Sequence, residues 1–154
     1  MTDPVHIGLL TAIPYFAAIV ASIYNNAMAD KHRERRWHTA VPCAITAVGL
    51  MLAGMHFDSL VLTMLILTVS AAAASTTQAA FWSVPPTFLN GAAAAAGIAL
   101  INSLGNIGGM VSTSVVGWIT DLTGNAQNSL ILFGGMLLVS VILVLMLPSK
   151  LVNH

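Results

Sequence analysis

The chain has 154 residues, of which 57% are apolar and only 6% are charged, and its formal net charge is zero. Soluble domains contain about a quarter charged residues, so this composition excludes an ordinary soluble domain and is typical of a membrane protein. Zero net charge argues against a nucleic-acid partner, and the lone Cys43 excludes an internal disulfide.

Five uncharged apolar segments follow one another, each long enough to cross a bilayer of about 30 Å at about 1.5 Å per residue. Backbone groups in lipid must be hydrogen-bonded within their own segment, so each segment is predicted to be a helix. The sequence therefore predicts an all-α integral membrane protein, a single membrane domain of residues 1–154. The helices are expected at residues 5–29, 39–57, 59–82, 92–120 and 129–147.

Charge is concentrated in one stretch, ADKHRERRWH at residues 29–38, which holds six of the ten charged residues. Six charges in mid-bilayer would cost roughly 15–20 kcal/mol, so this stretch is predicted to be a loop. With five spans, every Lys and Arg lies on the side of this loop, whereas Asp3, Asp58 and Asp121 lie on the other. The positive-inside rule then predicts an inner (plasma) membrane protein with its N-terminus outside and its C-terminus in the cytoplasm.

Two helices carry polar stripes at helical spacing, which should face protein or a water-filled cavity rather than lipid. Bonding of hydroxyls to their own helix, or bonding between helices, would explain the same stripes. The stripes are Thr11, Tyr15, Ala18, Ser22 and Asn25 in the first helix, and Ala71, Ser75, Gln78 and Trp82 in the third.

The fourth helix places small residues at every fourth position, Gly105, Gly109 and Gly117 with Thr113 between them. This pattern lets two helices approach closely, so we predict a helix-packing ridge. Asn102 and Asn106 lie beside the ridge, one turn apart. Packing does not explain two amides in a span, so we interpret them as binding or gating groups.

The predicted spans contain no charged residue, that is, no Asp, Glu, Lys or Arg. A proton relay or a counter-ion for a charged substrate usually requires such a residue. No hydrolase, phosphate-binding or metal-ligand motif is present. His32 and His38 are interpreted as solvated loop residues. We therefore expect no enzyme, no cofactor and no metal site.

The segment NAMADKHRERR at residues 26–36 resembles the loop motif G-x-x-x-D-R-x-G-R-R of major facilitator superfamily transporters. Asp30, Arg35 and Arg36 match the motif, whereas Asn26 and Arg33 stand where its two glycines are expected. Further segments resemble the anion:cation symporter branch, which includes phthalate, tartrate, glucarate and hydroxyphenylacetate permeases. They are GLLTAIPYFAA at 8–18, ERRWH at 34–38, FWSVPPTFLNGAAAAAGIALINSLGNIGG at 81–109 and GWITDLTG at 117–124.

The resemblance covers essentially the whole chain and aligns it with the eighth to twelfth helices of a twelve-helix transporter, a partial C-terminal half of that fold. It implies proton-coupled symport of a small organic anion, such as a sugar acid or an aromatic or dicarboxylic acid. The cationic anchor and the protonatable carboxylate are then expected in an N-terminal half, without which the chain should be inactive. The resemblance implies a central cavity lined by Tyr15, Gln78, Trp82, Asn102 and Asn106, and a cytoplasmic latch of Asp30, Arg35 and Arg36.

Two other interpretations fit the same residues. The chain could be a small multi-pass interaction or assembly protein, with the glycine ridge as its docking face. A homo-oligomeric channel has less support, because no charged position that could form a ring is visible in any span.

Overall fold

The computed structural model describes residues 4–55, 57 and 59–149 and contains only helices within them. The predicted all-α fold is therefore confirmed. The helices are α1 (Pro4–His32), α2 (Arg35–Gly54), α3 (Leu60–Trp82), α4 (Pro85–Phe88), α5 (Gly91–Thr123) and α6 (Asn128–Met146). Within the residues that the structure describes, α2, α3, α5 and α6 are long and apolar enough to cross a membrane. The 29-residue α1 covers the first predicted span.

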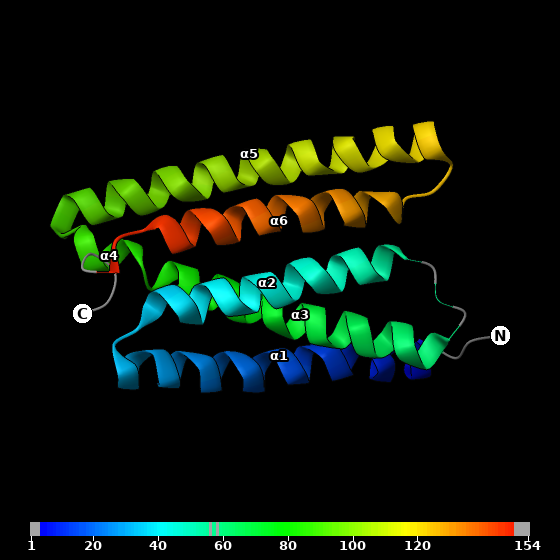
Figure 1. Cartoon of the computed structure of the whole chain (residues 1–154), viewed down its shortest axis with the longest axis horizontal. Helices are drawn as coiled ribbons and strands as arrows, with labels where there is room; N and C mark the ends of the chain where they lie inside the picture. The colour runs from blue at the N-terminus through cyan, green and yellow to red at the C-terminus, as the bar shows by residue number, and fades with distance from the viewer. Residues whose placement is uncertain (1–3, 56, 58, 150–154) are drawn as a thin grey trace.

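The five long helices lie side by side in the order α1, α3, α2, α6, α5 across the bundle, where α1 and α3 run parallel and the other neighbours antiparallel (Figure 1). Helix α3 packs between α1 and α2, and α2 packs on α6. Among the described elements, helix α5 contacts α6 and the short α4 alone, and none of its residues is buried. The bundle is thus well packed around α2 and open around α5.

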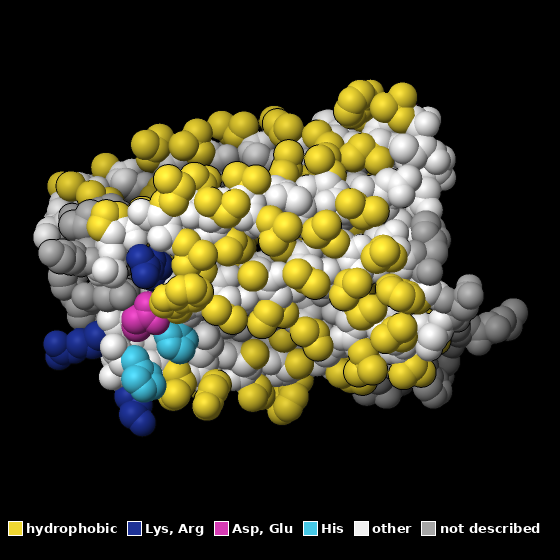
Figure 2. Space-filling model, in the orientation of Figure 1, with side chains coloured by type: hydrophobic (Ala, Val, Ile, Leu, Met, Phe, Trp, Pro, Cys, Tyr) yellow, Lys and Arg dark blue, Asp and Glu magenta, His cyan; other side chains and the backbone are white. Residues whose placement is uncertain are grey.

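Large apolar side chains cover the outside of the bundle, whereas the charged side chains of residues 30–36 gather at one end (Figure 2). Asp121, near the end of α5, lies at the other end. The buried apolar residues are small, nearly all of them alanines in α1, α2 and α3. Helices in lipid gain nothing by burying large apolar groups against each other, so they associate through small residues that permit close contact. The exposed leucines and isoleucines are suited to contact acyl chains.

Two glycines allow the closest helix contacts. A Cβ atom on Gly134 of α6 would lie 2.8 Å from the carbonyl oxygen of Ala47 and would also overlap Met51 of α2. A Cβ atom on Gly49 of α2 would overlap the Ser70 hydroxyl of α3. These positions, which the small-residue pattern did not single out, hold α2 against its two neighbours.

The predicted ridge of Gly105, Gly109 and Gly117 lies on open surface instead. A Cβ atom at any of the three would have no described atom within 4 Å outside its own helix and chain neighbours. The ridge therefore packs on no element of this part of the chain. That the ridge packs against a helix of a partner stays a prediction.

The charged stretch is not the loop that we predicted. Helix α1 continues through His32 and α2 begins at Arg35, so only Arg33 and Glu34 lie between them. The reason is length: 29 residues span roughly 43 Å, and about 30 Å suffices for the hydrocarbon core. The charged residues can therefore lie outside the hydrocarbon core, on the helix ends that extend beyond it.

Helix α1 ends in a Schellman motif, in which Glu34 N donates to Ala29 O at 3.0 Å and Arg33 N donates to Asp30 O at 3.3 Å. This motif requires a left-handed residue, and Arg33 takes that conformation with a φ of 50°. Arg33 is also the position where the resembling loop motif has glycine. The backbone thus keeps a glycine-type turn without the glycine.

Replacing Arg33 with glycine should therefore stabilise the chain by about 0.5–1 kcal/mol. Relief of a left-handed side chain contributes about 1–2 kcal/mol, and the added freedom of glycine in the unfolded chain removes about 0.5–1 kcal/mol. Unfolding of the full chain by sodium dodecyl sulfate, followed by circular dichroism, measures the change. Arg33→Ala, which loses the charge but keeps Cβ, is the control; equal stability of the two variants would contradict the account.

Candidate functional site

The polar stripe of α3 lies on the side that this chain leaves open. Ser75 and Gln78 are exposed and Trp82 is half-buried, whereas Thr76 and Ala80 on the opposite side are buried. Trp82 packs edge-on against Phe81, with ring centroids 5.4 Å apart. The stripe is thus free to contact something other than α1 and α2.

Gln78 lines a groove of about 500 Å³ between α3 and α6, with α2 as its floor. We call this the α3–α6 groove. Its other polar residues are hydroxyls that already donate to carbonyls of their own helices, at distances of 2.8 to 3.2 Å. Gln78 makes no hydrogen bond to another described residue, so its amide can both donate to and accept from a bound group. The hydroxyl residues are Thr39, Thr46, Thr77 and Ser140.

The other candidate residues lie elsewhere. Tyr15 is 74% exposed and lines a separate hollow of about 350 Å³ between α1 and α3, together with Ser75. Asn102 and Asn106 are exposed on α5 and make no hydrogen bond to other described residues. This chain by itself therefore does not bring the five predicted cavity residues into one site.

Beyond Tyr15 the α1 stripe makes contacts between helices, which is the alternative considered above for such stripes. Its role as a cavity lining stays a prediction. The Ser22 and Thr76 hydroxyls lie 3.4 Å apart and join α1 to α3. The Asn25 amide donates to the His38 carbonyl oxygen at 2.9 Å, and its oxygen lies 3.0 Å from His38 Nδ1. His38 is half-buried in this contact and is not the solvated loop residue that we expected.

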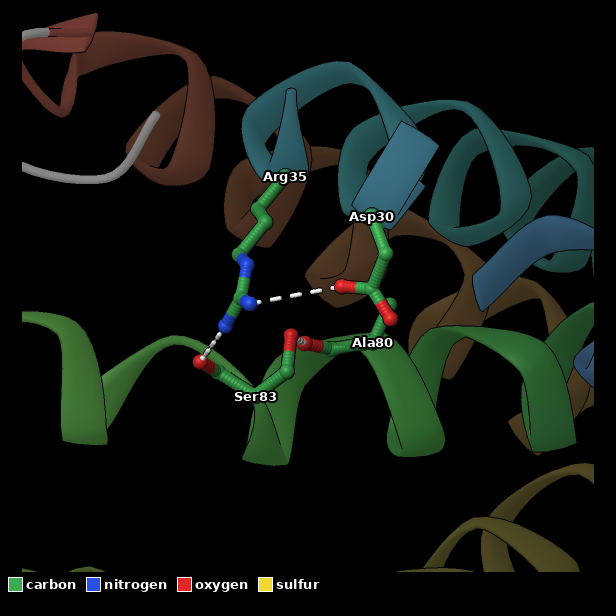
Figure 3. Close-up of polar contacts among 4 residues, drawn as sticks. All are labelled: Asp30, Arg35, Ala80 and Ser83. Atoms are coloured by element: carbon green, nitrogen blue, oxygen red, sulfur yellow. Dashed lines mark hydrogen bonds and ion pairs between the residues drawn. The ribbon is translucent and has the colours of Figure 1, made fainter. Parts of the chain in front are cut away.

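Two consecutive arginines at the start of α2 connect four helix ends, and Figure 3 shows the contacts of the first, Arg35. Arg35 forms an ion pair with Asp30 of α1 at 3.3 Å and donates to the Ser83 carbonyl oxygen, at the end of α3. Arg36 donates to the Leu147 carbonyl oxygen at 3.3 Å, at the end of α6. Carbonyl groups at helix C-termini carry partial negative charge, so both contacts are electrostatically favourable.

Arg35 should matter more to stability than the ion pair in which it takes part. Asp30 is 69% exposed at its side chain and Arg35 only 23%. We expect Asp30→Asn to cost less than about 1 kcal/mol, and Arg35→Gln to cost about 2 kcal/mol because the α3 end also loses a charged donor. The same unfolding assay compares them; a larger loss from Asp30→Asn would contradict this ranking.

The described residues contain no group of three or more His, Cys, Asp or Glu side chains that could hold a metal ion. The polar groups described above are amides and hydroxyls along the helices and a charged cluster at the helix ends. Comparison with known proteins places these features in a family.

The family model described as Major Facilitator Superfamily matches residues 1–152. The chain belongs to the Major Facilitator Superfamily. Its resemblance to these transporters, inferred above from short motifs, is thus confirmed over nearly the whole chain. The chain is a multi-pass membrane protein of this superfamily.

Its relatives are named as transporters. The chain is 45% identical over its full length to a Pseudomonas putida protein named as metabolite transport protein NicT. It is 40% identical over 95% of its length to an Agrobacterium vitis protein named as a tartrate transporter. It is 35% identical over 96% of its length to an Acinetobacter baumannii protein named as a quinolone resistance transporter.

The chain covers 35%, 32% and 34% of these three superfamily members, so it spans about a third of the length of the curated relatives it matches. No solved structure matches it significantly.

Proposed function

We propose that the chain forms part of a transporter for a small organic anion, coupled to protons, and that it transports only when joined to the remaining part. The observation that carries the proposal is the amide of Gln78 in the α3–α6 groove, which bonds to no other described residue. An amide without a partner is costly in lipid, so protein or a polar substrate should cover it. The names of the relatives, among them a tartrate transporter, favour an organic acid.

The amides of Asn102 and Asn106 support the same proposal, because they too lie exposed in a membrane-spanning helix. Amide groups can bind carboxylate and hydroxyl oxygens without carrying charge. The predicted spans contain no charged residue. The cation that neutralises the anion and the group that carries the proton would then lie in the remaining part, the N-terminal half expected above.

Asp30, Arg35 and Arg36 would act as a gate at the cytoplasmic side. Their bonds join the ends of α1, α3 and α6 to the start of α2. A set of charge-assisted bonds of this kind can stabilise one of two conformations and break in the other. In this arrangement the N-terminus lies outside and the C-terminus in the cytoplasm, as the distribution of basic residues predicts.

A chimera tests the proposal. The segment of the Pseudomonas putida relative that aligns with this chain is replaced by residues 1–154, and the purified chimera is reconstituted into proteoliposomes. We expect saturable uptake of a radiolabelled organic acid, from a panel that includes tartrate, driven by an inward proton gradient. The chain alone should give no uptake. Saturable uptake by the chain alone, or none by a folded chimera across the panel, would contradict the proposal.

A second candidate function is a membrane protein that binds and assembles with another one. The open surface around Gly105 and Gly109 favours it, because small residues there would allow close approach of a partner helix. Under this alternative, Gly105→Leu with Gly109→Leu should abolish co-purification with the remaining part of the Pseudomonas putida relative. Asn102→Leu with Asn106→Leu should leave co-purification intact. Under the transport proposal the asparagine pair should also abolish uptake by the chimera.

A further inference from the structure

We propose that a groove between α1 and α2 binds one anionic phospholipid, with an acyl chain in the groove and the headgroup phosphate at the α1–α2 turn. This α1–α2 groove is lined by Ala17, Ala21, Tyr24, Val41 and Ile45, and α3 forms its floor. The site does not depend on transport, and a failure of either proposal leaves the other standing.

The groove exists because α1 and α2 contact each other much less than either contacts α3. Alanines at 17 and 21 on the wall and at 72 and 73 on the floor leave a space of about 430 Å³. Two of its three polar lining residues are already engaged: Asn25 bonds to His38, and the Thr76 hydroxyl donates to Ala72 O at 2.8 Å; Thr68 is the third. An apolar chain fits this lining better than a polar ligand.

The groove leads toward the charged end of the bundle. On α1 the stripe of Ala21 and Tyr24 continues at helical spacing to Lys31, about 10 Å beyond Tyr24 along the helix axis. On α2 the stripe of Ile45 and Val41 continues to Trp37, which is 49% exposed. Tryptophan is favoured at the level of lipid headgroups. Figure 2 shows the basic and histidine side chains at this end, beside the apolar surface.

The charges at the turn complement a phosphate. Residues 30–36 contain four basic and two acidic side chains. Asp30 is paired with Arg35, and the Glu34 carboxylate accepts from the backbone N–H of Trp37 at 3.4 Å. Lys31 and Arg33 are exposed, so their charged groups can reach a headgroup at the mouth of the groove.

A lipid with net negative charge is favoured over a zwitterionic lipid, because the latter carries its own cation beside the phosphate. A basic side chain at a membrane surface strengthens attraction to anionic lipid by about fivefold. Two such side chains should therefore change the affinity by about tenfold or more.

Native mass spectrometry of the full chain in detergent tests the site. Titration with phosphatidylglycerol should give one bound lipid at about tenfold lower concentration than titration with phosphatidylcholine of the same acyl chains. Lys31→Gln with Arg33→Gln should remove this preference, and the charge-conserving pair Lys31→Arg with Arg33→Lys should retain it. Equal binding of the two lipids by the unchanged chain, or an unaltered preference in the glutamine pair, would overturn the proposal.

The groove itself is tested by Ala21→Leu, which fills it and should weaken phosphatidylglycerol binding at least fivefold. Ala99→Leu, an exposed alanine on α5, is the matched control and should have no effect. Inorganic phosphate should not displace the lipid at equal concentration. Displacement by phosphate would show that only a free anion is bound. Undiminished binding by a folded Ala21→Leu variant would show that the acyl chain does not lie in the groove. Either result would overturn the lipid site. Circular dichroism of each variant confirms that it is folded.

Discussion

Replacing Gly134 with leucine is expected to lower the free energy of unfolding by about 3 kcal/mol, since overpacking of a tight contact typically costs about 1–3 kcal/mol or somewhat more. The added side chain would have to displace Met51 and the backbone carbonyl at Ala47, which cannot move without shifting α2. Helix α6 connects α5 to the rest of the bundle, so this contact also positions the α5 amides.

The neighbouring glycine provides the control for this experiment. A Cβ atom on Gly135 would meet no described atom within 4 Å outside its own helix and neighbours. Gly135→Leu should therefore be neutral or stabilising by up to about 1 kcal/mol, because leucine is a better helix former than glycine. Gly105→Leu should behave in the same way in this chain. Sodium dodecyl sulfate unfolding of the three variants checks the order; a destabilised Gly135→Leu variant equal to Gly134→Leu would refute the role of close packing.

Replacing Gln78 with leucine should reduce kcat/KM for uptake by the chimera by about 10- to 100-fold. A hydrogen bond to a charged group is worth about 1.5–3 kcal/mol, which corresponds to this range. The effect should appear in uptake at low substrate concentration, while the amount of folded chimera in the liposomes stays the same. Transport is thus the readout that distinguishes binding by the Gln78 amide from a structural role.

Thr63→Val is the matched control, because Thr63 is a polar residue of the same helix whose hydroxyl donates to Ser59 O at 3.1 Å, away from the α3–α6 groove. It should change kcat/KM by less than about threefold. Unchanged uptake by the Gln78→Leu chimera would remove Gln78 from the substrate site.

The positions of the long helices could be predicted because apolar length and the scarcity of charge leave few alternatives in a membrane. Helix α3 was expected at residues 59–82 and lies at Leu60–Trp82; α6 was expected at residues 129–147 and lies at Asn128–Met146. The turn at Arg33 was missed, because charge says that residues lie outside the hydrocarbon but not whether they are helical there. The loop motif held the available signal for this turn, because one of its two glycines corresponds to Arg33, which takes a left-handed conformation.

Contacts between helices were harder to predict, because periodicity gives the face of a residue but not the partner of that face. Ser22 and Asn25 share a stripe with Tyr15, yet the first two bond to Thr76 and His38 while Tyr15 stays exposed. Gly134 precedes another glycine, and only the packing of α6 on α2 shows which of the two is indispensable.

The membrane arrangement is the claim on which the rest depends, and cysteine accessibility tests it most directly. Single cysteines are placed in a Cys43→Ser background at Arg33 and Asn90, at one end of the bundle, and at Ser59 and Ala126, at the other (Figure 1). In intact spheroplasts a membrane-impermeant maleimide should label positions 59 and 126, and it should label positions 33 and 90 only after permeabilisation. Labelling of positions 33 and 126 from the same face would contradict a chain that crosses the bilayer with its arginines inside.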